Sequence, residues 1–108
     1  MRRIRVVVIT AALAAGSSVA LAQKGTAAKG KEVFEGQCSV CHNADSADKK
    51  IGPGLKGLYK HDKLANGKPV NDNSVRDQVN EGGNGMPGYK DILSDQERAD
   101  LLAYLKTL

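Results

Sequence analysis

Two cysteines and a histidine in the first half of the chain are the residues best suited to do chemistry. They stand in the run Cys38-Ser39-Val40-Cys41-His42, whose spacing is that of a covalent haem attachment site. Each thiol can add to one vinyl group of a porphyrin and form a thioether. Residues three positions apart lie on the same side of a helical turn, so both sulfurs can reach one edge of the macrocycle. His42 can then offer a ring nitrogen to the iron.

Three other uses of these cysteines explain the pattern less well. A structural zinc site needs four ligands, and the only further candidate is His61. A thioredoxin-like dithiol needs a βαβ setting, whereas the surrounding sequence has the pattern of helices. A plain disulfide across two intervening residues is strained and leaves the histidine without a role. We therefore interpret Cys38 and Cys41 as haem-attachment residues and His42 as the fifth iron ligand.

Met86 is the best candidate for the sixth iron ligand. Once Met1 leaves with the leader described below, Met86 is the only methionine. It lies in a glycine-flanked, proline-stiffened loop outside any apolar periodic run, so filling a core explains it poorly. A thioether is a soft, neutral donor that favours ferrous iron and raises the reduction potential. An iron with both axial positions filled changes oxidation state with little movement, which suits electron transfer.

Two alternatives for the sixth position remain. His61 stands between Lys60 and Asp62 in a polar loop and is most simply a solvated surface histidine. The position could also be open or exchangeable, which would suit binding of a small ligand.

The first 22 residues have the three parts of a secretory leader. A basic start (1–5) precedes an apolar run (6–15), and the segment closes on Ala20-Leu21-Ala22, a small-x-small cleavage site. We expect cleavage after Ala22, which leaves residues 23–108 as one monohaem domain in the periplasm. The competing interpretation is an uncleaved anchor, because the 18 residues between Arg5 and Lys24 carry no charge and approach the length of a membrane span.

The net charge of +4 belongs mostly to the leader. Without its three arginines the chain has thirteen basic and twelve acidic residues, which gives no reason to expect a nucleic-acid partner. Residues 23–68 hold nine lysines and five acids, and residues 69–108 hold four basic and seven acidic groups. A lysine-rich side could steer docking to an acidic redox partner, although an ordinary solvated surface explains the pattern equally well.

The mature chain contains little material for a hydrophobic core. It has one Phe, three Tyr and no Trp, which is little for a domain of this size. A haem would supply a large, flat apolar body in their place. The low aromatic content is therefore consistent with a buried cofactor.

Helical signals surround the cysteine motif, and the sequence contains no convincing strand. Thr26 is a candidate N-cap for a helix to about Gln37, and Ser74 for a short helix to about Glu81. Ser94 and Glu97 form a capping box at the start of a last helix with a broad leucine face. Gly30 is costly inside the first helix, which suggests that another element approaches it closely. Between these helices, residues 52–54 read as a fixed turn and residues 84–89 as an extended loop.

These pieces, in this order, resemble a family, the class I c-type cytochromes of the small bacterial periplasmic kind. The resemblance covers nearly all of residues 26–108 and is carried by Gly30-Lys31, Phe34, Cys38-Ser39-Val40-Cys41-His42, Gly52-Pro53-Gly54-Leu55, Gly57-Leu58, Asn84-Gly85-Met86-Pro87 and Leu101-Leu102-Ala103-Tyr104-Leu105.

The resemblance implies an all-α cytochrome c fold, with three to four helices wrapped around one covalent haem c. It also implies that the first and last helices cross, with Gly30 and Phe34 packed on Leu101 and Tyr104. It assigns to Pro53 the carbonyl that accepts a hydrogen bond from the iron-binding histidine.

We expect a periplasmic carrier, monomeric or weakly associated, that shuttles single electrons between redox proteins and is not an enzyme. Its donor and acceptor would be periplasmic or membrane proteins, with the chain itself at the membrane only if the leader stays attached. The alternatives are a haem subunit of a periplasmic dehydrogenase or oxidase, and a ligand-binding or peroxidase-like haem protein.

Overall fold

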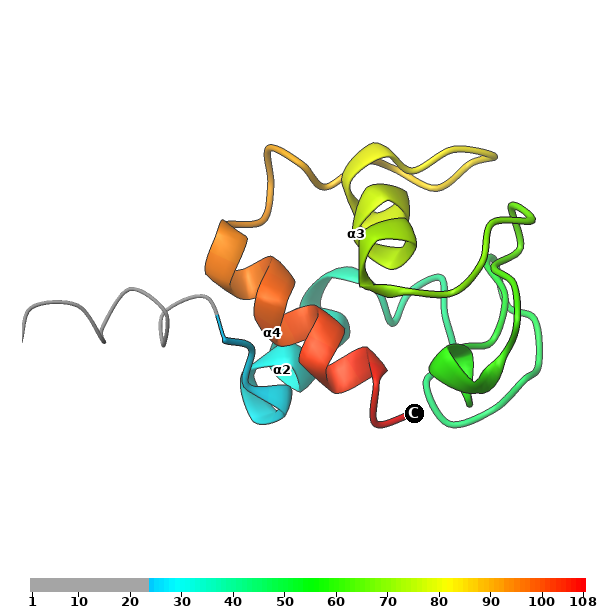
Figure 1. The fold of residues 1–108 in the computed structure, drawn as a ribbon, viewed down its shortest axis with the longest axis horizontal. Coiled ribbons are helices and arrows are strands. Elements are labelled where there is room, and N and C mark those ends of the chain that lie inside the picture. The colour runs from blue at the N-terminus through cyan, green and yellow to red at the C-terminus, as the bar shows by residue number, and fades with distance from the viewer. Residues whose placement is uncertain (1–23) are drawn as a thin grey trace, which may run out of the picture.

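A computed structural model of the chain describes residues 24–108. In that range the chain forms three α-helices, α2 (Ala27–Gln37), α3 (Asp72–Glu81) and α4 (Asp95–Leu105), and one 3-10 turn, η1 (Leu58–Lys60). Long loops join these elements, and residues 24–108 contain only isolated β-bridges and no strand (Figure 1). The predicted all-α fold is confirmed, with three helices. The leader and its cleavage after Ala22 lie outside the described residues and stay predictions.

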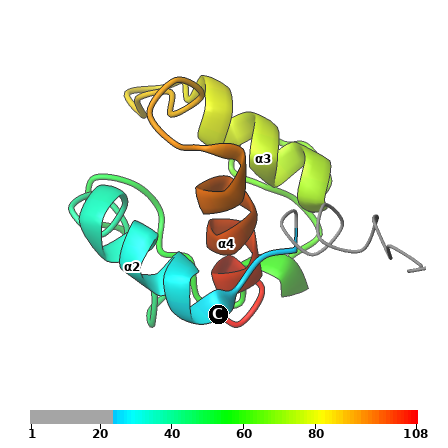
Figure 2. The same cartoon turned by 90° about the vertical axis from the view of Figure 1, so that its left-hand side faces the viewer.

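The first and last helices of this range cross at a glycine. A Cβ on Gly30 would overlap the backbone oxygen of Asp100 and stand 2.7 Å from the Cβ of Tyr104. One turn along α2, the ring of Phe34 tilts at 55° against Tyr104 with centroids 5.6 Å apart, a favourable aromatic geometry. α3 packs beside α4, as a view from the end shows (Figure 2). The expected crossing of the two helices is confirmed, and it explains the costly glycine.

One of the three predicted helix starts, that of α3, needs correction, and Thr26 caps α2 as predicted but without a side-chain hydrogen bond. The backbone N–H of Thr26 donates instead to Asp100 Oδ1 at 2.8 Å. The cap of α3 is Asn71 rather than Ser74. Asn71 Oδ1 accepts from the Ser74 amide at 2.8 Å while Ser74 Oγ accepts from the Asn71 amide at 3.0 Å. Ser74 is thus the inner half of the capping box, and the helix starts earlier because asparagine caps as well as serine.

The start of α4 is as predicted. The Glu97 amide donates to Ser94 Oγ at 3.1 Å, and the Ser94 amide donates to Glu97 Oε1 at 3.0 Å. This capping box fixes the direction in which α4 leaves the preceding loop.

The hydrophobic core is small and follows α4. Its buried members come from all three helices and from one loop residue: Phe34, Val75, Val79, Leu93, Leu101, Leu102 and Leu105. None of the helices within residues 24–108 is long and apolar enough to span a lipid bilayer.

A polar contact ties the C-terminal end of the chain to α3 and to η1. Asp72 accepts from the Tyr59 hydroxyl at 3.0 Å and from Lys106 Nζ at 3.0 Å, and the ammonium lies 5.7 Å from the Tyr59 ring centroid. The hydrogen bond from Lys106 is the main cause that lowers the pKa of Asp72, and burial together with Asp72 raises the pKa of Tyr59.

We expect the Lys106 contact to stabilise the fold at neutral pH and to fade in acid. A carboxylate whose pKa is lower in the folded chain stabilises above its unfolded pKa of about 3.9, and the gain is lost as pH falls through the folded value. Because both side chains are about half exposed, Lys106→Met should cost only roughly 0.2–1 kcal/mol. Urea unfolding of both proteins at low salt, at neutral pH and below about pH 3, measures the difference. A cost that is equal at both pH values would contradict an ionic contribution.

Candidate cofactor site

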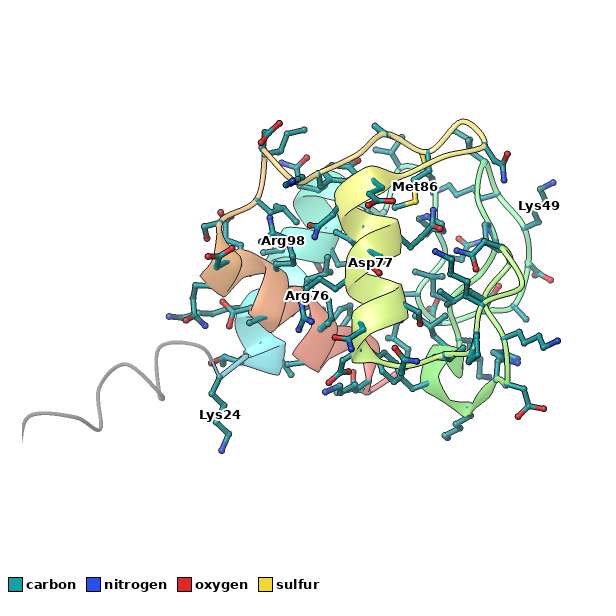
Figure 3. All side chains as sticks on the ribbon, turned by 45° about the horizontal axis from the view of Figure 1, so that its top comes forward. Lys24, Lys49, Arg76, Asp77, Met86 and Arg98 are labelled. Carbon is teal, nitrogen blue, oxygen red and sulfur yellow. The ribbon has the colours of Figure 1, made fainter. Side chains whose placement is uncertain are left out.

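A cleft of about 340 Å³ brings the cysteine–histidine motif together with Met86. Cys38, Cys41 and His42 line it where the chain leaves α2, and Met86 lines it from the loop after α3. The remaining wall is mostly apolar and includes Phe34, Leu55, Leu58, Val79, Leu101 and Leu105. Figure 3 shows the Met86 sulfur beside α3, on the side that faces the long loops. All four predicted site residues therefore meet at one cleft, whereas His61 is exposed and is not part of its lining.

The motif sits on a tight turn that continues the end of α2. The amide of Cys38 donates to the carbonyl of Phe34 at 2.8 Å, and the amides of Cys41 and His42 both donate to the carbonyl of Cys38, at 3.1 and 3.0 Å. The turn places Cys38, Cys41 and His42 on the cleft in the way that their spacing predicts.

His42 is oriented by the Gly52-Pro53 turn. Its Nδ1 lies 2.8 Å from the carbonyl oxygen of Pro53. Because a carbonyl can only accept, Nδ1 carries the proton, and the lone pair is left on Nε2, free for a metal. A Cβ on Gly52 would stand 2.5 Å from Cε1 of the ring, so the absence of a side chain there lets the imidazole lie against the backbone. The carbonyl partner implied by the family resemblance is confirmed.

The Cys38 thiol differs from the reactive thiol of a redox-active dithiol. Burial is the main cause that raises the pKa of the Cys38 thiol to about 11, with the charge of Cys41 adding to it. Reactive dithiols of the thioredoxin kind work through a lowered thiol pKa. The raised pKa of Cys38 therefore argues against a thioredoxin-like cycle between thiol and disulfide at this residue.

Met86 follows a two-residue turn that the sequence analysis described wrongly as extended. Asn84 and Gly85 both have positive φ, 52° and 89°, the backbone of a type I′ turn. Gly83 and Met86 close the turn through hydrogen bonds of 2.9 and 3.0 Å in both directions. Asn-Gly is the preferred sequence for this turn, so the sequence does contain the signal. The prediction of extended backbone rests instead on the proline at residue 87, which disfavours helix in the residue before it.

Gln78 is a site residue that sequence reasoning missed. Its Nε2 lies 3.5 Å from Met86 Sδ and 3.2 Å from the carbonyl oxygen of Gly82, while Asn66 Nδ2 donates to its Oε1 at 3.0 Å. The amide therefore links a distant loop, the end of α3 and the methionine. Nothing in the spacing marks Gln78, because its partners meet only in the folded chain.

The cleft fits a haem by its lining and by the chemistry of its donors. A neutral imidazole nitrogen and a thioether sulfur are the soft-to-borderline ligands that suit haem iron, and the mostly apolar wall suits a porphyrin face. Within residues 24–108, no three His, Cys, Asp or Glu side chains gather closely enough to bind a metal ion by themselves. An imidazole nitrogen and a thioether sulfur suit a haem iron, whose porphyrin would supply its other four ligands.

Comparison with known proteins gives a consistent family. Residues 27–108 match the model of the family described as cytochrome c. The chain is 40% identical over 81 residues to cytochrome c6 of Synechocystis, covering 72% of this chain and 62% of that relative's length. It is 38% identical to a cytochrome c-553-like protein of Synechocystis, covering 84% of this chain and 77% of the relative.

A solved structure supports the same family at the level of the fold. The structure of cytochrome c6 from the diatom Phaeodactylum tricornutum superposes with a TM-score of 0.62 at 29% identity, covering 77% of this chain and 93% of the other.

Proposed function

This chain belongs to the cytochrome c family, and on that basis we propose that it carries single electrons between redox proteins in the periplasm through a His/Met-ligated haem c. The family match and the relatives identify the chain as a class I c-type cytochrome, a family with a covalent haem and an electron-transport role. The specific ligands, the compartment and the status of a free carrier are the proposal.

The observation that carries the proposal is the meeting of two pre-oriented donors at one apolar cleft. The contact with Pro53 leaves Nε2 of His42 available, and the amide of Gln78 faces the sulfur of Met86. Holding both ligands in place before and after electron transfer keeps the cost of reorganisation low, which is what a carrier requires.

Each site residue has a distinct task in this proposal. Cys38 and Cys41 would hold the porphyrin by thioether bonds, and His42 and Met86 would ligate its iron. The bound haem supplies the one-electron couple of its iron. The protein excludes water with the apolar wall of the cleft, and its methionine favours the ferrous state.

The surface near the cysteines suits an acidic partner. Val40 and Ile51 are 67% and 69% exposed, and Lys49 and Ile51 line the cleft. Lys50 lies at the same surface, because its Nζ donates to the backbone oxygen of Ser39 at 2.9 Å. We propose that acidic redox proteins dock here, with lysines steering the encounter and the apolar side chains forming close contact.

A free carrier fits this surface better than a permanently bound subunit. In residues 24–108 the large apolar side chains that are exposed are Val40, Ile51 and Ile92. A permanent subunit interface needs a much broader apolar area. We propose export to the periplasm on the strength of the predicted leader, because thioether attachment in bacteria, as the family implies, takes place there.

Optical spectra of the exported protein in both oxidation states test the proposed ligation. We expect the thioether–ferric-iron charge-transfer band in the oxidised protein and no spectral shift when carbon monoxide is added to the reduced protein. A missing band together with ready carbon monoxide binding would show an open iron and favour a sensing or catalytic haem protein instead.

A further inference from the structure

The segment that follows Met86 is held from two sides at Lys90. The amide of Lys90 donates to the carbonyl of Asn80 in α3 at 3.2 Å, and its carbonyl accepts from Arg98 Nη2 in α4 at 3.0 Å. Just before it, the amide of Tyr89 donates to the carbonyl of Val79 at 2.9 Å. This short stretch of backbone therefore bridges α3 and α4 only four residues after the methionine.

Arg98 forms the α4 side of this bridge as a buried cation. Its Nη2 also donates to the carbonyl of Leu93 at 2.9 Å, and its Nη1 donates to Asp95 Oδ1 at 2.8 Å. The side chain of Asp95 is fully exposed while that of Arg98 is 8% exposed, so water screens the ion pair, and the two carbonyls are the partners that matter. The Nε of Arg98 is buried without an acceptor. Burying Nε without an acceptor costs free energy, so the two carbonyls that Arg98 binds explain its burial better than its ion pair with Asp95 does.

Different elements hold the two sides of Met86. On the N-terminal side, Gly83 and Met86 exchange two backbone hydrogen bonds, and Gln78 Nε2 donates to the carbonyl of Gly82 at 3.2 Å. On the C-terminal side, a Cβ on Gly88 would come 2.7 Å from the carbonyl oxygen of Asn80, so the backbone lies directly against α3. The C-terminal side of Met86 is therefore held against α3 by the stretch that Arg98 fixes to α4.

We propose that Arg98 is a positioning residue for the axial methionine: its guanidinium fixes Lys90 and Leu93 against α4 and thereby keeps Met86 on the iron. The inference rests on the proposed ligation by Met86. Arg98 touches neither the cleft nor the sulfur, so it acts through the backbone alone.

Ligand exchange in the ferric haem protein tests this role. We expect Arg98→Leu to bind added imidazole about tenfold or more tightly than the wild type. Imidazole must displace Met86 from the iron, and in this variant the segment after Met86 is no longer held against α4. Arg98→Lys should fall between the two, because the shorter lysine side chain keeps the charge but brings its ammonium less closely to the two carbonyls that Arg98 Nη2 binds. Arg76→Leu is the charge control, because Arg76 is bound only to Asn73 at 3.3 Å on its own helix; it should bind imidazole like the wild type.

Amide hydrogen exchange separates positioning from general weakening and does not depend on the iron. In Arg98→Leu the amides of Tyr89 and Lys90 should exchange at least tenfold faster, while that of Gly30 at the helix crossing should keep its protection. The role of Arg98 would be overturned if all three amides exchanged as in the wild type, or if all three became faster by the same factor. An imidazole affinity no different from that of the wild type would overturn it as well. If the wild type itself lacks the thioether band, the ligation by Met86 is wrong, and the role of Arg98 for the iron falls with it.

Discussion

Replacing Met86 with alanine is expected to keep the haem attached, open the iron and lower the reduction potential. The thioethers from Cys38 and Cys41 and the bond from His42 do not involve Met86, so the haem stays in place. Loss of the thioether removes the ligand that favours ferrous iron. The fall should be on the order of 100 mV or more, a modest part of the ~0.8 V range that axial ligands span.

Three measurements check this expectation on the same sample. The charge-transfer band should vanish from the ferric spectrum, the reduced protein should bind carbon monoxide, and a redox titration should give the lower potential. Ile92→Ala is a matched control, because Ile92 lies in the loop that follows Met86 but is 56% exposed; its spectrum and potential should equal those of the wild type. A Met86→Ala protein with the wild-type spectrum would refute the ligand assignment.

The chemistry of the site could be predicted because the spacing of its residues along the sequence is characteristic. Cys38, Cys41 and His42 form a recognisable motif within five residues. Met86 is predicted because it is the only methionine left after loss of the leader and lies in a loop with glycines and a proline. The structure brings them to one cleft. Their roles as ligands stay predictions until the haem protein is measured.

What orients the site could not be predicted from the residues alone. Gln78 and Arg98 each act on backbone or side chains that lie far away until the chain folds. Arginine and glutamine on a helix are ordinarily solvated, so neither carries a signal in the sequence. The Gly52-Pro53-Gly54 turn offers carbonyls that could accept from His42, but only the family resemblance assigns this role to Pro53, because a backbone carbonyl as a partner leaves no trace in residue type.

The error at the start of α3 and the missing side-chain hydrogen bond at Thr26 have a similar cause. Asn71 and Ser74 are both good caps three residues apart, and the sequence does not say which of them stands outside the helix and which inside. At Thr26 the expected side-chain cap is missing because a buried carboxylate from α4, Asp100, takes the amide of Thr26 directly. A tertiary contact has replaced a local one.

Gly30→Ala is expected to cause a large loss of stability through that same helix crossing. The new methyl would overlap the Asp100 carbonyl and press on Tyr104, and a backbone atom cannot move aside as the end of a flexible side chain can. The helices must separate, which also loosens Phe34 against Tyr104. Overpacking of this kind costs roughly 1–3 kcal/mol or more, even though alanine favours helix by up to ~1 kcal/mol.

Gly36→Ala separates the two effects because it makes the same change in the same helix. A Cβ at Gly36 meets nothing within 4 Å, so only the gain in helix propensity remains, and the variant should be slightly more stable than the wild type. Thermal unfolding of the haem-loaded proteins should then place the two alanine variants on opposite sides of the wild type, with roughly 4–8 °C per kcal/mol for a domain of this size. If both variants gained stability alike, the close approach at Gly30 would be wrong, and with it the explanation of why the chain tolerates a helix-weakening residue there.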